Sequence, residues 1–192
     1  LGDVYKRQCD ALSKSAELQI AVKRVDASAA QSISMVVQRA LANYMLPRVL
    51  APFMRRHPTA NIRVHSETQE ASLDLFRSGA VDAAIVFATP EAKEFDGVVI
   101  GSDPLRIVAS PGHQLAKRKQ VALAELEHFD FVGGLRESQF YRLVEATLKA
   151  SGLPKYRVIL HMQDSIAIAN AVIHGIGLAC TLSCVLQQAI AE

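Results

Sequence analysis

Several features that would indicate a class of protein directly are missing from this sequence. Its formal net charge is only +2 over 192 residues, which does not indicate a basic surface for nucleic acid. No apolar run approaches the roughly 20 residues that span a bilayer, and no basic segment followed by an apolar core marks a secretory signal. With 50% hydrophobic and 21% charged residues, the chain has the composition of a globular protein of one large or two small domains.

Cysteine is scarce, and the three thiols allow two interpretations. Cys9, Cys180 and Cys184 form no CxxC pair. Free thiols in a reducing compartment such as the cytoplasm are one interpretation. The other places Cys180 and Cys184 on one helical face as a metal or redox pair near His174, although the usual zinc spacings are absent. We expect free thiols, no metal and no cofactor.

Catalytic motifs are absent as well. GIGLAC has Cys180 where the dinucleotide fingerprint needs its third glycine, and GxxxxGK[ST], GxSxG and HExxH do not occur. Asp74, Asp82 and Asp164 lie on different predicted elements and show no pairing that would suit acid–base chemistry. The sequence therefore does not predict an enzyme.

The N-terminal segment is unlike the rest of the chain. Residues 1–8, LGDVYKRQ, resemble a translated adaptor scar and are treated as a non-native leader. Apolar residues between 9 and 25 recur at roughly helical spacing. We therefore assign 9–30 to the end of a helix and a following loop.

A regular alternation of strands and helices begins after this segment. The pattern predicts strands at 33–37, 62–67 and 83–87 and helices at 40–56 and 70–78. Linking helices imply parallel neighbouring strands, and the uniformly apolar 83–87 suits a strand that is covered on both faces. Gly79 is the expected left-handed end of the second helix. Asp82 is then either a catalytic acid or, as we expect, an acceptor for backbone amides of the turn.

The second half has a different order of elements but is again α/β. We expect two short strands within 97–111 joined by a turn at Ser102-Asp103-Pro104, and strands that cross between the two halves. The remaining expected elements are a short helix at 121–126, strands at 129–133, 156–162 and 175–182, and helices at 139–150 and 165–174.

Ligands of open parallel α/β sheets collect at the carboxyl ends of the strands. Two such units that face each other would enclose a cleft. Five segments follow predicted strands, and each is either part of a binding site or an ordinary solvated loop. They are Gln38-Arg39-Ala40, Glu67-Thr68-Gln69, Phe87-Ala88-Thr89, Gly133-Gly134 and Asp164-Ser165.

Several segments together resemble the effector-binding domain of LysR-type transcriptional regulators. The similar stretches are YMLPRVLAPFMRRHP (44–58), LFRSGAVDAAIVF (75–87), DPLRIVASPGHQLA (103–116), VALAELEHFDFVG (121–133) and MQDSIAIANAVIHGIGLAC (162–180). No single stretch is decisive, but five in the right order are a specific signal. They cover about residues 33 to 184.

The resemblance implies an α/β, two-lobed type 2 periplasmic-binding-protein-like fold, with subdomain I at 31–105 and subdomain II at 106–192. It implies that the five segments bind a small, often anionic effector between the lobes. This chain departs from the family where hydroxyl residues are common, at Ala40 and Gln69. Arg39 and Gln69 are candidates to supply a charge and an amide instead.

The resemblance also implies parts that lie outside this sequence. The family reads DNA through an N-terminal winged helix-turn-helix and continues past the C-terminus of this chain, so we expect truncation at both ends. It also implies a homo-oligomer, dimer or tetramer, with no membrane contact. Two alternatives stay open: a transporter's solute-binding protein, which a secretory signal would favour, and an enzyme on this fold, which would need a clustered acid and base.

Overall fold

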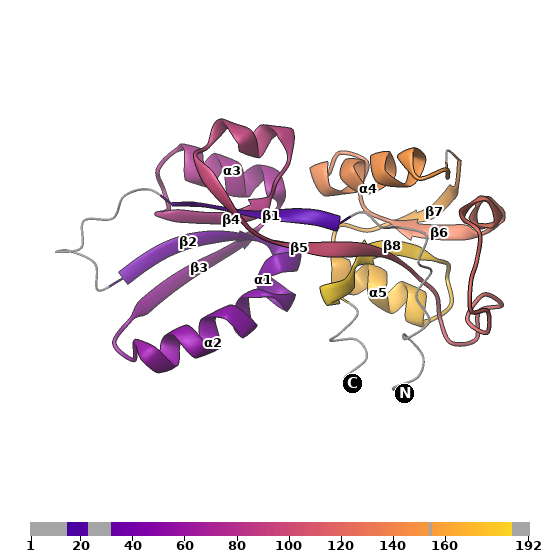
Figure 1. The fold of residues 1–192 in the computed structure, drawn as a ribbon, viewed down its shortest axis with the longest axis horizontal. Helices are drawn as coiled ribbons and strands as arrows, with labels where there is room; N and C mark the ends of the chain where they lie inside the picture. The colour runs from indigo at the N-terminus through magenta and orange to yellow at the C-terminus, as the bar shows by residue number, and fades with distance from the viewer. Residues whose placement is uncertain (1–14, 23–31, 154, 186–192) are drawn as a thin grey trace. The chain divides into compact units, whose positions relative to one another are not determined.

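The protein divides into two compact units. A computed structural model describes residues 15–22, 32–153 and 155–185. The N-terminal unit comprises Glu17–Ser102 and the C-terminal unit begins at Asp103, near the boundary at residue 105 that we expect from the sequence. Each unit has strands and helices of its own (Figure 1).

The N-terminal unit is built on a parallel sheet. Its strands β2 (Ser32–Gln38), β3 (Asn61–Glu67) and β4 (Ala83–Phe87) are ordered β3-β2-β4, and β2 pairs with both neighbours in parallel. The connecting helices are α1 (Arg39–Tyr44), α2 (Leu46–Arg56) and α3 (Gln69–Arg77). Figure 1 shows α3 on one face of this sheet and α1 and α2 on the other. The predicted parallel arrangement is confirmed.

One core cluster of this unit lies between α3 and the sheet. Leu73 and Phe76 of α3 pack against Val36 of β2 and Val86 of β4. All five residues of β4 are buried, as its apolar sequence predicts. Gly79 has a φ of +77° just after α3, a conformation that side chains with a Cβ rarely adopt. The helix therefore ends where the glycine allows the chain to turn back toward β4.

The helical assignment of the N-terminal segment is wrong where the structure describes it. Residues Ser15–Val22 form strand β1, which pairs antiparallel with β4, Ile20 opposite Ile85. In the sequence, Leu18, Ile20 and Val22 alternate with Glu17, Gln19 and Ala21, which is a strand period. The strand also provides hydrogen-bond partners for an edge of β4 that would otherwise be unpaired. Residues 1–14 and 23–31, with the rest of that prediction, lie outside the described residues.

The predicted turn between two short strands at 97–111 is also wrong. A single strand, β5 (Gly97–Val108), runs through Ser102-Asp103-Pro104 and passes from one unit into the other. The Asp103 carboxylate accepts hydrogen bonds from Ser183 Oγ (2.5 Å) and Cys184 N (2.9 Å). Asp103, which the sequence pattern assigned to a turn, is here hydrogen-bonded to residues far along the sequence and lies in an extended strand. One strand does cross between the two units, as expected.

The C-terminal unit repeats the α/β layering. Its elements are η2 (Leu123–His128), β6 (Asp130–Gly133), α4 (Gln139–Ala150), β7 (Arg157–His161), α5 (Ser165–Ile173) and β8 (Ala179–Leu182). Strands β6 and β7 are parallel, and β8 is antiparallel to β5. Leu178, the residue just before β8, forms a parallel bridge with Phe131 of β6. α4 and α5 lie on opposite faces of these strands (Figure 1). None of the described helices is long and apolar enough to cross a membrane.

Asp82 has a structural role that links two strands. Its Oδ2 accepts from Ser34 N at 2.8 Å, and Asp82 N donates to Ser34 O at 2.8 Å. Its partner is thus an amide of β2, not of its own turn as expected. We predict that Asp82→Ala lowers the free energy of unfolding by about 1–3 kcal/mol, because Ser34 N loses its acceptor in a partly buried place.

Urea denaturation measures this effect, with Asp74→Ala as the matched control. The Asp74 side chain is 72% exposed, so its removal should change stability by no more than about 0.5 kcal/mol. Equal effects of the two substitutions would show that the bond to Ser34 contributes nothing specific.

Candidate functional site

Three of the five candidate segments meet at one edge of the N-terminal sheet. Gln38, Glu67 and Phe87 are the last residues of β2, β3 and β4. The strands are parallel, so their carboxyl ends lie at the same edge, and Gln38 is directly opposite Glu67 in the register. The sheet therefore brings together segments that are up to about fifty residues apart in the sequence.

Gln69 holds two of these segments together. The residue is 1% exposed. Its Nε2 donates to Phe87 O (2.9 Å) and to Thr89 Oγ1 (3.4 Å), and its Oε1 accepts from Phe87 N (3.1 Å). The amide is thus fully occupied by the chain, and Gln69 positions the loop after β4 rather than offering its amide to a ligand. Thr68 is similarly engaged, since its Oγ1 caps α3 by accepting from Ala71 N.

Gln38 and Arg39 lie at the start of α1. The Gln38 side chain is hydrogen-bonded to the chain, and the Arg39 side chain is not. Gln38 is buried, and its Oε1 accepts from Ala40 N (2.9 Å) and Leu41 N (3.3 Å). These two amides are therefore already satisfied. Arg39 is partly buried, and its side chain has no hydrogen bond or ion pair with any residue in the described part of the chain. Arg39 is the cation available at this edge of the sheet.

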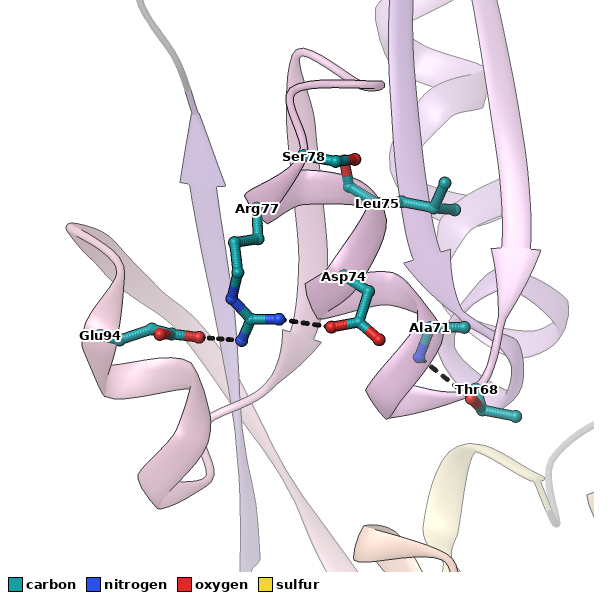
Figure 2. A network of polar contacts seen from close by, with 7 residues as sticks. All are labelled: Thr68, Ala71, Asp74, Leu75, Arg77, Ser78 and Glu94. Atoms are coloured by element: carbon teal, nitrogen blue, oxygen red, sulfur yellow. Dashed lines mark hydrogen bonds and ion pairs between the residues drawn. The ribbon is translucent and has the colours of Figure 1, made fainter.

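The segment after β4 is also held from the far end of α3 (Figure 2). Arg77 forms ion pairs with Asp74 on its own helix and with Glu94 at the end of η1 (Pro90–Glu94). Its guanidinium also lies 5.7 Å from the centre of the Phe95 ring. These contacts are exposed and individually weak. Together with Gln69 at the other end of the helix, they attach residues 87–95 to α3 at two points.

In the C-terminal unit, Gly133 and Gly134 lie against an aromatic ring. A Cβ on Gly133 would lie 2.9 Å from Tyr141 Cε2, closer than carbon atoms approach, so a side chain there would displace the ring. Gly134 O lies 2.9 Å from His161 Nδ1, and the His161 ring is 6.0 Å from that of Tyr141. The sequence reasoning missed Tyr141 and His161. The position of His161 as the last residue of β7 was the available signal.

Asp164 and Ser165 come just after β7, at the start of α5. Because β6 and β7 are parallel, these two residues lie at the edge of the C-terminal strands where Gly133 ends β6. Asp164 Oδ1 accepts from Ile166 N (2.8 Å) and Ala167 N (3.2 Å), so its carboxylate caps the helix. Ser165 Oγ is buried and has no hydrogen-bond partner in the described residues. Ala40 and Ala88 offer only backbone atoms, and the Phe87 ring is part of the core at 1% exposure.

The cysteines do not form the alternative pair. Cys180 lies in β8 and Cys184 lies after it, so the two do not share a helical face, and both are free thiols. Burial raises the pKa of Cys180 to about 12. Burial, followed by the nearby Asp103 carboxylate, raises the pKa of Cys184 to about 12. Among the described residues no group of three or more His, Cys, Asp or Glu could hold a metal ion.

We predict that these two thiols react slowly in the folded protein. At pH 8, a pKa near 12 instead of the usual 8.5 reduces the thiolate fraction by roughly a thousandfold. A Cys9→Ser variant should therefore label with a disulfide reagent far faster in denaturant than in buffer. Rapid labelling of either thiol before unfolding would contradict the burial.

Comparison with known proteins identifies the family. The family model described as the LysR substrate binding domain matches residues 26–192. The chain belongs to this family. The match decides against the solute-binding proteins of transporters, and the predicted recognition and fold class are confirmed.

Curated relatives and solved structures agree with this assignment. The chain is 28% identical over 137 residues to a RuBisCO operon transcriptional regulator of Allochromatium vinosum, covering 71% of this chain and 45% of that protein. The chain thus spans about half the length of the curated relatives it matches. The regulatory domain of Synechocystis CcmR, solved with 2-PG, has a TM-score of 0.71 at 21% identity, covering 81% of this chain and 74% of that one. The effector-binding domain of QuiR, solved with shikimate, has a TM-score of 0.68 at 14% identity, covering 79% and 73%. At these identities the two structures show a shared fold.

Proposed function

We propose that this chain is the ligand-sensing part of a transcriptional regulator and that it binds a small anionic metabolite. The observation that carries the proposal is Arg39, a partly buried arginine without a partner among the described residues, at the edge where three strands end. A guanidinium in such a place binds carboxylate or phosphate through a fork of donors. The family and the ligand-bound neighbours support the same role. No catalytic step is part of the proposal.

In the whole protein, ligand binding would alter how a DNA-bound regulator sits on its promoter. The described residues are accounted for by two α/β units, assigned to subdomain I (31–105) and subdomain II (106–192). Reading a DNA sequence requires a helix or ribbon in a groove. We therefore assign DNA binding to a winged helix-turn-helix beyond this chain, in a protein that works in the cytoplasm.

The test combines calorimetry with DNA binding. A panel of small organic acids and phosphate esters is titrated into this chain, and the acids that bind are added to promoter gel shifts of the full-length protein. We expect at least one acid to bind and to change the shift. Specific promoter retention by this chain alone, or no binding by any acid, would overturn the proposal.

Self-association is the second part of the proposal. α2 buries only Leu46, while Val49 and Met54 on the same helix are 51% and 37% exposed. Val64 of the neighbouring edge strand β3 is 36% exposed. A helix and an edge strand that leave large aliphatic side chains in water favour an interface with a second copy.

We predict that Val49→Glu shifts the protein toward monomer in sedimentation velocity, since a charge would have to be buried in the interface. Lys149→Glu on the exposed side of α4 is the control for an added acid. Unchanged association of the Val49 variant would exclude this face as the interface.

A further inference from the structure

Two polar atoms in the C-terminal unit are buried without a partner. Arg106 Nε in β5 and Ser165 Oγ at the start of α5 have no hydrogen bond to any residue in the described part of the chain. Arg106 is also without an ion pair among those residues, and the residue as a whole is only partly buried. Arg106 is not among the candidate site residues chosen from the sequence, and the site described above does not include it.

The strand pairing shows which face of the sheet Arg106 belongs to. Arg106 is opposite Thr181 of β8, and two residues further on Val108 is opposite Ala179. Val108 and Ala179 pack against Val172 of α5. Because alternate residues of a strand share a face, Arg106 and Thr181 lie on the face that α5 covers.

The helix places Ser165 on the same side. Ser165 is seven residues before Val172 and three before Ile168, and both of these pack in the same cluster. Such spacings share one helix face. α5 follows β7 and leads into β8, which is parallel to β6 and therefore to β7, so the helix runs back along the sheet. Its first turn therefore lies over the end of β8, near Thr181, where Arg106 is paired.

An arginine in this position needs an acceptor. Taking a charged donor out of water without a partner is costly, and Thr181 beside it is 7% exposed. The Asp164 carboxylate at the same helix end is engaged with the amides of Ile166 and Ala167. No described side chain therefore neutralises the guanidinium.

We propose that Arg106 and Ser165 bind the carboxylate or phosphate group of a small molecule beneath the first turn of α5. The guanidinium donates to two oxygens of the group, and the Ser165 hydroxyl donates to one. The site lies wholly within the C-terminal unit and does not need Arg39. It rests on the proposed sensing function only for the identity of the molecule.

The Nε–H resonance of Arg106 in a ¹⁵N NMR spectrum of the 192-residue chain tests the site directly. Inorganic phosphate and sodium acetate are titrated separately, with sodium chloride keeping the ionic strength constant. We expect a saturable shift of this resonance with at least one of the two anions, and the stronger response identifies phosphate or carboxylate as the preferred group. No saturable shift with either anion would overturn the proposal.

Variants show whether the binding uses these side chains. Calorimetry measures the variants, because Arg106→Gln and Arg106→Lys lack the arginine Nε–H resonance. Arg106→Gln should weaken anion binding at least about tenfold, and Arg106→Lys should weaken it less, because lysine keeps the charge but loses the fork. Ser165→Ala should weaken it severalfold. Arg142→Gln is the matched control, since Arg142 is exposed on α4 and donates to Glu137 O at 2.6 Å, and it should leave the affinity unchanged.

Arg39→Ala separates this site from the proposed function. In the Arg39→Ala variant, the shift of the Arg106 Nε–H resonance should saturate at the same phosphate or acetate concentration as in the unsubstituted chain, because this resonance reports the site beneath α5 and not the one at Arg39. Anion binding that survives Arg106→Gln in a folded variant, as judged by its circular dichroism, would show an adventitious ion only and would overturn the assignment.

Discussion

Replacing Gln69 by leucine is expected to lower the free energy of unfolding by about 2–5 kcal/mol. The substitution keeps much of the side-chain volume but removes the hydrogen bonds to Phe87 and Thr89. The buried Phe87 N and Phe87 O each lose a hydrogen bond, although Phe87 O still accepts from Thr89 N (2.8 Å). A hydrogen bond lost in a buried place costs about 1–3 kcal/mol. Urea or thermal denaturation gives the value.

A matched control separates this effect from the loss of any glutamine. Gln163 is exposed in the loop before α5, and Gln163→Leu should change stability by no more than about 0.5 kcal/mol. If Gln69→Leu is equally mild, the loop after β4 has other support. Hydrogen exchange at Phe87 and Thr89 should also speed up in the Gln69 variant, because the amide that fixes this loop is gone.

The regular parts of the fold could be predicted because local signals agreed with one another. The segment 83–87 is apolar throughout and becomes β4, buried along its whole length. Gly79 ends α3 with a positive φ. The two errors have the same origin. Residues 15–22 and the Ser102-Asp103-Pro104 stretch were judged by local pattern, but their structures depend on β4 and on residues 183 and 184.

The places of the five candidate segments at the ends of strands were predictable, but the contacts of their side chains were not. The ends of parallel strands share an edge whatever their side chains are, so the five segments could be chosen from strand order. The bonds that Gln38, Gln69 and Asp164 make were not visible, because each depends on the final backbone geometry. Three side chains expected to face a ligand are instead engaged with the chain, whereas Arg39 has no hydrogen bond or ion pair with any described residue.

Arg39→Ala is expected to weaken the binding of an acidic effector by about 1.5–3 kcal/mol, the scale of hydrogen bonds to a charged group. That corresponds to roughly a 10- to 150-fold higher dissociation constant. Arg39→Lys should weaken binding less, because the ammonium keeps the charge but cannot present two parallel donors. Calorimetry with the acids that bind the unsubstituted chain measures both variants.

Glu67 provides an independent check on the sign of the charge at this edge. Glu67 lies opposite Gln38 in the strand register, and Gln38 is the residue before Arg39. Glu67 forms no ion pair with Arg39. A carboxylate close to a bound anion repels it, so Glu67→Gln should strengthen binding of the same acids, and the gain should shrink as salt is added. Asp96→Asn, an exposed acid in the segment between η1 and β5, serves as the control and should have little effect. If an acid binds, Arg39→Ala leaves its affinity unchanged and Glu67→Gln does not raise it, then this edge of the sheet does not bind the anion.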